Sequence, residues 1–329
     1  MNQSCWIITD EGKIGTENQC VGLAEALGFS YTLKRVSAKW PWVHLPASLW
    51  VHPLKCLTKS LMPPWPSLII GAGRVSAAPV AYIRKIASGK TKVIQILNPY
   101  LSLDNYDVVI VPEHDQINGK NVLTTVGALN KLTQDILNQG AHQFEPFFKN
   151  LPRPLIVVLI GGSNKAYTLD EAVLETLIDQ LKTLIKTQGV GLAITISRRT
   201  GEAATQKIRQ AFKGLPVFIW EGIGPNPYFG FLAKADFILV TEDSVSMASE
   251  ACFTGKPVYI VPLKGHSAKF DRFHQSLRDK GYTRLFKGEL DLWSSPPLQE
   301  TQRIAQELKE KWGIYSVSHK ISIPIKSEE

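Results

Sequence analysis

The second half of the chain alternates short apolar runs with longer segments whose apolar residues recur at helical spacing. Leu155–Ile160 is an almost purely β-branched and leucine run, which is typical of a strand buried on both faces of a parallel sheet. Regular alternation of such strands with helices predicts one parallel sheet with right-handed crossovers. The other predicted strands are Gly191–Ser197, Val217–Trp220, Asp236–Thr241 and Pro257–Pro262. The predicted helices are Thr168–Lys186 (opening on a Thr168–Glu171 capping box), Glu202–Phe212, Tyr228–Ala233, Ser244–Thr254, Lys269–Lys280 and Pro297–Trp312.

The first half has the same organisation in a less regular form. A strand at Trp6–Thr9 is followed by a helix at Glu17–Leu27, and Gly28 is placed to end that helix. The remaining strands predicted here are Tyr31–Val36, Ser67–Gly71, Lys92–Leu97, Tyr106–Val111 and Val122–Thr125, with a helix at Arg74–Ser88. The pattern therefore predicts an α/β protein with two Rossmann-like domains.

The proline-punctuated stretch Phe144–Pro154 is the predicted domain boundary. A chain of 329 residues is long enough for two hydrophobic cores. We expect an N-terminal domain at residues 1–150 and a C-terminal domain at residues 151–329. The last helix could return to the first domain.

Residues 38–66 interrupt this regular pattern. The segment holds four of the eight tryptophans, with prolines and Lys39, Lys55 and Lys59 between them. The prolines exclude one long helix, so short helical pieces with exposed rings are expected. Two interpretations stay open: a peripheral membrane contact, because tryptophan favours the interface and lysine the anionic head groups, or an interior packed by aromatic rings.

The charge and cysteine content narrow the class of protein. The net charge of +8 is spread over both halves without a basic stripe, so nucleic-acid binding is not expected, whereas anionic substrates or an anionic membrane face are. The four cysteines form no CxxC pair, which favours buried free thiols in a reducing compartment. No signal-peptide pattern and no apolar run of roughly 20 residues occurs. We expect a cytoplasmic protein that could associate peripherally with the inner face of a membrane.

Ligands of open parallel sheets bind beyond the carboxyl ends of the strands, and the loops at those positions are polar here. Gly161–Lys165 follows one strand, and its glycines would let backbone amides approach a phosphate. Arg198 and Arg199 follow the next strand and could hold a diphosphate by bidentate bonds. The alternatives are a flexible turn and a solvated pair of charges.

The segment around the predicted helix Ser244–Thr254 carries the strongest pattern. Asp243 is the predicted N-cap, and helical spacing puts Ser246, Met247 and Glu250 on one face with it. The open helix N-terminus could bind phosphates, and Glu250 could accept hydrogen bonds from ribose hydroxyls. The alternative is that the serines only cap the helix and Glu250 is only solvated. Lys264 follows the next strand and could reach the same cleft.

Loops after strands in the first half also carry polar groups. Asp10–Gln19 follows the first strand, and Gly71–Arg74 is a GxGR turn suited to an anionic or hydroxylated group. Glu113–Asp115 could contain a general base or could be a turn with an Asp cap. No HxH, HExxH or DxD pattern occurs at these positions, so we predict no metal site and no cofactor.

Several of these segments, taken in order, resemble one family. Residues 155–163, 191–200 and the stretch TEDSVSMASEACFTGKPVYIVPL resemble the donor half of GT-B glycosyltransferases. TDEGKIGTENQCVGLAEALG, IIGAGR, VPEHD, NVLTTVGALN and LIGGSNKAY, together with TEDSVSM, are similar to the plant mitochondrial-fission ("elongated mitochondria") family and its bacterial relatives over residues 6–287. The resemblance implies a metal-independent site in a cleft between two Rossmann-like domains.

The resemblance also implies roles for residues. Glu250 would meet the ribose, and the diphosphate would meet Gly162, Ser163, Arg198, Arg199, Ser244 and Ser246. The other residues expected in the nucleotide-sugar site are Asp243, Met247 and Lys264. The acceptor side would hold Gly15, Asn18, Gln19, Gly73 and Arg74. Many GT-B enzymes have one obvious catalytic residue on an N-terminal loop; here Asp10, Glu11 and Glu17 compete, with His114 behind them.

The sequence and the resemblance therefore suggest three functions. The first is a glycosyltransferase that moves a sugar from a nucleotide-sugar co-substrate to a lipid-linked or cell-envelope acceptor. The second is a non-catalytic protein of the same fold that recruits a partner at a membrane, as the fission role of the plant members suggests. The third is a nucleotide-sugar epimerase, because those enzymes share the two-domain fold.

Overall fold

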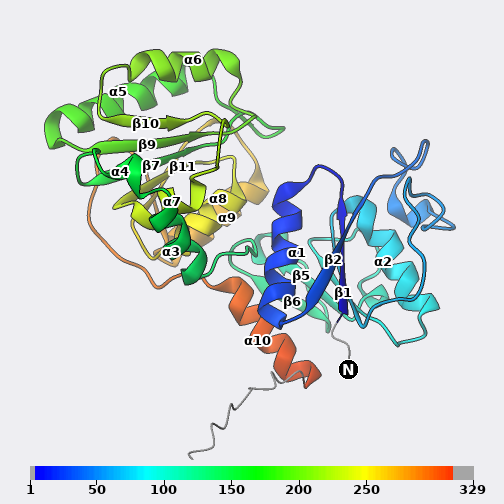
Figure 1. Cartoon of the computed structure of the whole chain (residues 1–329). Coiled ribbons are helices and arrows are strands. Elements are labelled where there is room, and N and C mark those ends of the chain that lie inside the picture. Colours follow the sequence, from blue (N-terminus) through cyan, green and yellow to red (C-terminus); the bar gives the residue numbers. More distant parts are fainter. Residues whose placement is uncertain (1–3, 314–329) are drawn as a thin grey trace, which may run out of the picture.

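The computed structural model describes residues 4–313 and contains two lobes, each built on a parallel sheet of six strands (Figure 1). The first sheet has the order β2-β1-β3-β4-β5-β6 and the second the order β10-β9-β7-β11-β12-β14, with every pairing parallel. In each sheet the strand order reverses direction beside the first strand of the lobe. This is the doubly wound arrangement expected from the alternating sequence pattern.

The first sheet is covered on both faces. Its strands are β1 (Ser4–Asp10), β2 (Ser30–Val36), β3 (Leu68–Ala72), β4 (Lys92–Ile96), β5 (Val108–Pro112) and β6 (Val122–Thr125). Helix α1 (Ile14–Leu27) packs on one face together with the C-terminal helix α10 (Glu300–Trp312), around Cys20, Leu23 and Ile304. Helix α2 (Arg74–Ile86) and part of segment 38–66 pack on the other face.

The second sheet is covered in the same way. Its strands are β7 (Leu155–Ile160), β9 (Gly191–Ile196), β10 (Val217–Trp220), β11 (Phe237–Thr241), β12 (Val258–Val261) and β14 (Thr283–Leu285). Helices α5 (Glu171–Gln188) and α6 (Glu202–Ala211) cover one face. The other face carries α3 (Gln134–Gln143), α4 (Glu145–Phe148), α7 (Tyr228–Lys234), α8 (Val245–Cys252) and α9 (Ala268–Asp279). A small antiparallel pair joins β8 (Tyr167–Thr168) to β13 (Lys264–Gly265).

The strands and helices predicted from the sequence are present, with ends shifted by a few residues. The predicted capping box at Thr168 is wrong, because Thr168 lies in β8 and Asp170 caps α5 by accepting the amide of Val173 at 3.0 Å. Helices α3 and α4 were not predicted. Helix α3 is largely polar, and it packs on α7 at a point where a Cβ on Gly140 would lie 2.8 Å from the amide nitrogen of Gly230.

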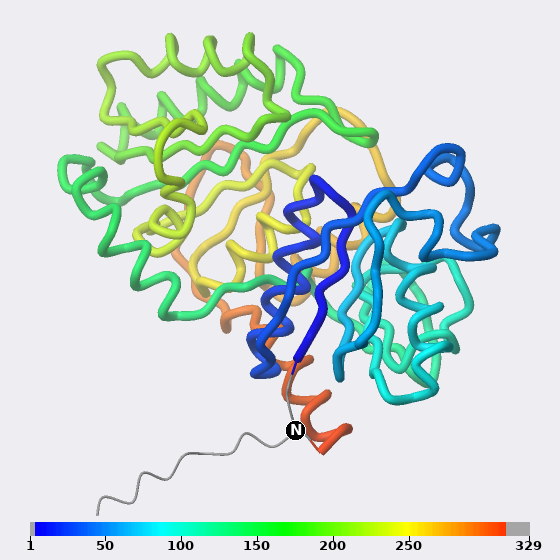
Figure 2. The backbone as a smooth tube through the Cα atoms, turned by 45° about the vertical axis from the view of Figure 1, so that its right-hand side comes forward, coloured from blue at the N-terminus to red at the C-terminus, as the bar shows by residue number. Residues whose placement is uncertain are grey.

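The chain crosses between the lobes twice, and the two crossings lie side by side. The first passes through residues 130–133 into α3 and α4, whose side chains join the core of the second lobe. The second passes through residues 298–301 into α10, which packs on α1 (Figure 2). The hydroxyl of Thr301 accepts the amide of Asn130 at 2.9 Å and donates to its carbonyl at 2.8 Å. The division at residue 150 stays a prediction; by packing, the chain enters the second lobe before α3.

Side chains also join the lobes away from the crossings. The amide of Ala128 donates to the hydroxyl of Ser249 in α8 at 2.8 Å. Arg272 in α9 donates to the carbonyl of His114 at 3.0 Å, and Lys269 pairs with Asp115 at 2.6 Å. These contacts fix how the carboxyl ends of the two sheets face each other.

Thr301→Val should lower the free energy of unfolding by about 2 kcal/mol, because it leaves the buried amide and carbonyl of Asn130 without partners. Urea unfolding at constant m-value measures the change. Thr183→Val, at an exposed position of α5, is the matched control and should stay within about 0.5 kcal/mol of wild type. An equal effect of both substitutions would contradict this account of the crossing.

Candidate functional site

A cavity of about 710 Å³ lies where the carboxyl ends of β9 and β10 face the start of α1. Ile14 is the first-lobe residue that lines it. The second lobe contributes the turn after β9, the first part of α6 and the loop after β10. These lining residues are Thr195, Ile196, Ser197, Arg198, Gly201, Glu202, Thr205, Arg209, Trp220, Glu221, Gly222, Ile223 and Asn226. The position agrees with the rule that open parallel sheets bind ligands beyond the carboxyl ends of their strands.

The N-terminus of α8 lies against the start of α1, next to cavity-lining Ile14, although no residue of α8 lines this cavity itself. Ser244 caps the helix by accepting the amide of Met247 at 3.3 Å, so the predicted N-cap Asp243 is wrong by one position. Within the described part of the chain, the amides of Val245 and Ser246 have no hydrogen-bond acceptor. A Cβ on Gly15, the residue after cavity-lining Ile14, would lie 3.6 Å from the hydroxyl oxygen of Ser246. The start of α8 therefore lies in contact with the start of α1 where the two lobes meet.

Asp243 binds protein groups, because its carboxylate is fully buried. One oxygen accepts the hydroxyl of Thr241 at 2.6 Å, and the other pairs with a guanidinium nitrogen of Arg199 at 2.7 Å. Arg199 was predicted to bind a diphosphate, and the structure gives its charge an internal partner. The pair joins the turn after β9 to the turn after β11.

The glycine turn after β7 packs against this ion pair. A Cβ on Gly161 would overlap the carboxylate of Asp243, and one on Gly162 would overlap the backbone of Arg199. These glycines therefore approach groups of the protein, and their predicted contact with a phosphate stays a prediction. The hydroxyl of Ser163 accepts the amide of Leu169 at 3.1 Å, which closes the same loop on itself.

Arg198 differs from its neighbour. Its side chain is exposed, lines the cavity and has no ion-pair or hydrogen-bond partner among the described residues. Lys264 lies elsewhere: it pairs with Asp170 at 3.4 Å and lines a separate cavity beside α5. Met247 is partly buried and packs against the core under α8. Of the two cations, only Arg198 lines this cavity, and its charge has no partner among the described residues.

Glu250 lies one turn further along α8 and is partly buried. The hydroxyl of Tyr228, at the start of α7, donates to its Oε2 at 2.6 Å. Burial raises the pKa of Glu250 from 4.5 to about 7, although the hydrogen bond from Tyr228 acts in the opposite direction. One oxygen of the carboxylate is therefore already paired, and its predicted contact with a ribose stays a prediction.

In the first lobe, Asp10 occupies the turn that was predicted to receive an anion. Its Oδ1 accepts the amides of Val75 at 3.0 Å and Ser76 at 3.3 Å, at the N-terminus of α2. A Cβ on Gly73 would lie 2.6 Å from the same oxygen. Burial raises the pKa of Asp10, and the bonds from the amides act against that rise. The GxGR turn thus binds a carboxylate, and this carboxylate belongs to the protein.

The other predicted acceptor residues are spread along α1 and α2. The guanidinium of Arg74 donates to the carbonyls of Val43 and Leu45, so it holds segment 38–66 in place. Gln19 is buried and Asn18 partly buried in α1. Of the predicted acceptor residues, Gly15 lies closest to α8, since it faces Ser246.

The remaining catalytic candidates also have structural partners. Glu17 forms a bidentate pair with Arg35 at 2.7 and 2.8 Å. His114 is buried against Phe273 of α9, with ring centroids 5.3 Å apart, and burial lowers its pKa to about 4. The turn Glu113–Asp115 is therefore part of the contact between the lobes, which agrees with the alternative prediction of a structural turn.

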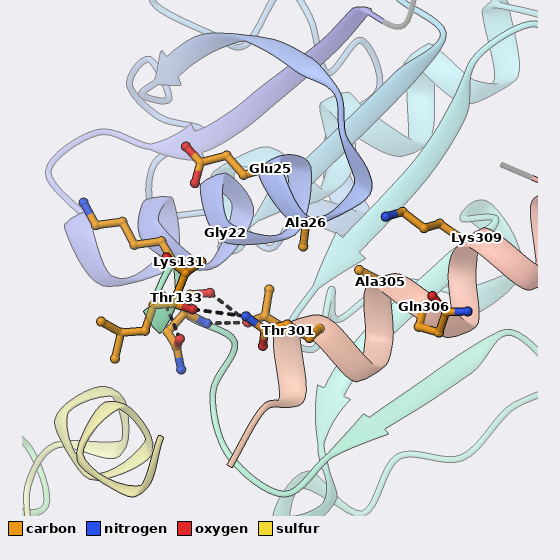
Figure 3. A pocket seen from close by; sticks show the side chains of 12 residues that line it. Gly22, Glu25, Ala26, Lys131, Thr133, Thr301, Ala305, Gln306 and Lys309 are labelled. Atoms are coloured by element: carbon orange, nitrogen blue, oxygen red, sulfur yellow. Dashed lines mark hydrogen bonds between the residues drawn. The ribbon is translucent and has the colours of Figure 1, made fainter. Parts of the chain in front are cut away.

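A second cavity, of about 340 Å³, lies at the chain crossing and not at the strand ends (Figure 3). Helix α1, residues 130–133 and helix α10 line it, and Asn130 and Thr301, which are bonded to each other, are among the lining residues. Over residues 4–313, no group of three or more His, Cys, Asp or Glu side chains could hold a metal ion. Over the same range, no helix is long and apolar enough to cross a bilayer.

Sequence reasoning missed the loop after β10. Trp220, Gly222, Ile223 and Asn226 line the cavity, and Tyr228 follows them. The sequence EGIGPNPY is rich in glycine and proline and directly follows a predicted strand. The rule applied to the other strands would have found it.

Solved structures define the class of fold. A UDP-GlcNAc 2-epimerase from Methanocaldococcus jannaschii superposes with a TM-score of 0.56 at 13% identity, covering 93% of this chain and 99% of that one. Os79 from O. sativa, in complex with UDP, gives a TM-score of 0.54 at 11% identity, covering 94% and 93%. The protein therefore has a GT-B-like fold, with two Rossmann-like domains facing across a cleft, as predicted.

The chain belongs to the mitochondrial fission ELM1 family, whose model matches residues 14–312. It is 36% identical to the mitochondrial fission protein ELM1 of Arabidopsis thaliana over 273 residues, 74% of this chain and 63% of that protein. The aligned region thus spans less than two thirds of the Arabidopsis protein. An uncharacterized protein of Rickettsia prowazekii is 26% identical over 92% of this chain and 97% of its own length. The resemblance inferred from the motifs is confirmed.

Glu250→Gln should remove a pH-dependent loss of stability. Because the folded state raises the pKa of Glu250 from 4.5 to about 7, the folded protein binds its proton more tightly than the unfolded chain does. The contribution of this group to stability is complete below pH 4.5 and is lost as the pH rises to 7. The difference in melting temperature between variant and wild type should therefore grow in favour of the variant across this range. Glu289→Gln, at an exposed position, is the control, and parallel curves for wild type and Glu250→Gln would refute the assignment.

Proposed function

We propose that the protein binds a nucleotide-activated sugar in the cleft between its two lobes and transfers the sugar to a lipid-linked acceptor. The observation that carries the proposal is the N-terminus of α8, where the amides of Val245 and Ser246 have no acceptor among the described residues and the side chain of Ser246 lies beside Gly15 of α1. Free amides at a helix start attract anionic groups such as a diphosphate. No metal ion is needed for this kind of contact.

The charges around the cleft support an anionic ligand. Arg198 lines the cavity with a free guanidinium group, while Arg199 is neutralised by the buried Asp243. The chain carries a net charge of +8. A guanidinium group and helix amides together suit the two phosphates of a nucleotide sugar.

Similar structures indicate which nucleotide to test first. The Os79 structure contains UDP, and a Methanocaldococcus jannaschii UDP-GlcNAc 2-epimerase of the same fold was solved with UDP-GlcNAc and UDP. A uridine diphosphate sugar is therefore the first ligand we propose for this chain. The base would lie beside the loop after β10, and the ribose near Glu250.

One observation favours a second function, a non-catalytic protein that recruits a partner. Asp10 caps α2, and His114 is buried between the lobes. Glu11 pairs with Lys59, and Glu17 pairs with Arg35. Each residue predicted as a catalytic base therefore has a structural role. On this view the nucleotide site would be inactive or regulatory, as the family name of a fission protein allows.

Titration calorimetry with UDP-, GDP-, CMP- and ADP-sugars tests the proposal on the intact chain. Binding of one of them supports the site, and failure of all of them would favour the recruiting protein. Release of free nucleotide in the absence of an acceptor would instead indicate epimerase chemistry. Sugar transfer to a lipid-linked acceptor would separate the transferase from an inactive site.

Arg198→Ala should weaken the binding of a nucleotide sugar by about 1.5–3 kcal/mol, which is roughly ten- to a hundredfold in Kd, because it removes a charged hydrogen-bond donor from the cavity. Its melting temperature should not change, since the side chain has no protein partner. Arg199→Ala should lower the free energy of unfolding by about 1–3 kcal/mol, because it removes the cation from the buried carboxylate of Asp243, which then keeps only the hydroxyl of Thr241. Lys264→Ala is the control for affinity. Equal affinity of wild type and Arg198→Ala would remove Arg198 from the site.

A further inference from the structure

Segment 39–56 forms one closed excursion from the first lobe, between β2 and β3. At its base, the amide of Lys39 donates to the carbonyl of Cys56 at 2.8 Å, and its ammonium group donates to the carbonyl of Lys55 at 3.1 Å. Ala38 and Leu57 form an isolated antiparallel bridge beneath these bonds. Figure 2 shows this blue stretch projecting from the edge of the lobe. We call residues 39–56 the tryptophan loop.

The inner side of the tryptophan loop is packed. Trp50 is only 6% exposed and joins the core beside α2, and its indole nitrogen donates to the carbonyl of Leu45. Trp42 packs edge-to-face on Trp50, with ring centroids 6.4 Å apart. The guanidinium group of Arg74 donates hydrogen bonds to the backbone carbonyls of Val43 and Leu45 in the loop. The expectation of an interior packed by aromatic rings therefore describes Trp50, and the loop has a fixed conformation.

The outer side of the loop exposes large apolar side chains. Trp40 is 82% exposed, Val51 76% and Leu49 56%. Met62, a few residues beyond the loop, is 68% exposed. Nothing in the described protein covers these groups, although Trp50 in the same loop is buried. Exposed apolar groups held on a rigid loop indicate a contact with something outside the chain.

The charges of residues 38–66 indicate which kind of partner this surface would contact. Residues 38–66 contain three lysines and two histidines and not one aspartate or glutamate. Lys59 pairs with Glu11, whereas the ammonium group of Lys55 has no carboxylate partner among the described residues. Exposed tryptophan together with unpaired lysine is the combination that suits the boundary between lipid head groups and acyl chains of an anionic bilayer.

We propose that the tryptophan loop docks the protein on an anionic lipid bilayer. Trp40, Leu49 and Val51 enter the head-group boundary, and Lys55 faces the lipid phosphates. The loop follows the carboxyl end of β2, where Ser37 bonds Glu11, so it lies at the same edge of the first sheet as the cleft. Docking would thus bring a lipid-linked acceptor to that edge; this last consequence rests on the proposed function, whereas the docking itself does not.

Cosedimentation with vesicles tests the docking. The intact chain should bind phosphatidylcholine vesicles that contain phosphatidylserine, bind pure phosphatidylcholine more weakly, and lose affinity as salt screens the lysines. Trp40→Ser should weaken binding about tenfold. Leu292→Ser is the matched control, because Leu292 is 84% exposed but lies in the second lobe, and it should bind like wild type.

The charge is tested by a second pair of variants. Lys55→Glu should weaken binding to the anionic vesicles, and Lys90→Glu, at an exposed position between α2 and β4, should not. Brominated acyl chains should quench part of the tryptophan emission of the wild type, and this part should be missing in Trp40→Phe. Melting curves should be unchanged in Trp40→Ser, and Val51→Ser replaces it if that variant does not fold.

No vesicle binding by the wild type, or equal losses in Trp40→Ser and Leu292→Ser, would overturn the proposal. An acidic protein partner for this surface would be indicated by the first of these outcomes. Nucleotide calorimetry on Trp40→Ser should match wild type, and vesicle binding by Arg198→Ala should match wild type. Failure of the docking is therefore distinguishable from failure of the nucleotide site.

Discussion

The buried carboxylate of Asp243 organises the carboxyl edge of the second sheet. It accepts the hydroxyl of Thr241 and pairs with Arg199, so it joins the turns after β11 and β9. The turn after β7 closes on the same group, because only a glycine at position 161 leaves room for the carboxylate. A buried charge without its partner is costly, so these three loops hold one another in a single arrangement. The position of Arg198 and the direction of α8 follow from that arrangement.

In the first lobe, too, a carboxylate of the protein packs against a glycine turn at the carboxyl end of the sheet. Asp10 follows β1, and its carboxylate accepts two amides at the N-terminus of α2 while Gly73 packs against it. In both lobes a glycine turn that looks suited to an external anion is filled by a carboxylate of the protein. The site we propose for an external anion therefore uses other groups, the start of α8 and the side chain of Arg198.

The contacts between the lobes explain why the two edges face each other. The crossings are bonded together through Asn130 and Thr301, and α9 holds the turn that contains His114. The GT-B-like fold and membership of the ELM1 family are thus established. Fold and family do not choose between a transferase and a recruiting protein, because function depends on the site that the fold carries.

The sequence by itself determined the two parallel sheets, most of their strands and helices, and the family. Hydrophobic periodicity reports whether each residue faces solvent or core, and that information is local. The sequence also predicted polar loops at the carboxyl ends of the strands, where the structure has a cavity. It did not find α3, whose polar residues become helical by packing on α7 at Gly140.

Only the tertiary structure decided which polar residues are free. Asp10 meets Val75, and Asp243 meets Arg199, across long separations along the chain. Trp40 and Trp50 belong to one short segment, yet one is exposed and the other buried. The sequence around a charged residue or an aromatic ring is the same whether its side chain contacts a ligand or another part of the protein. Its partner is set by how distant elements pack, and no pattern within one segment contains that information.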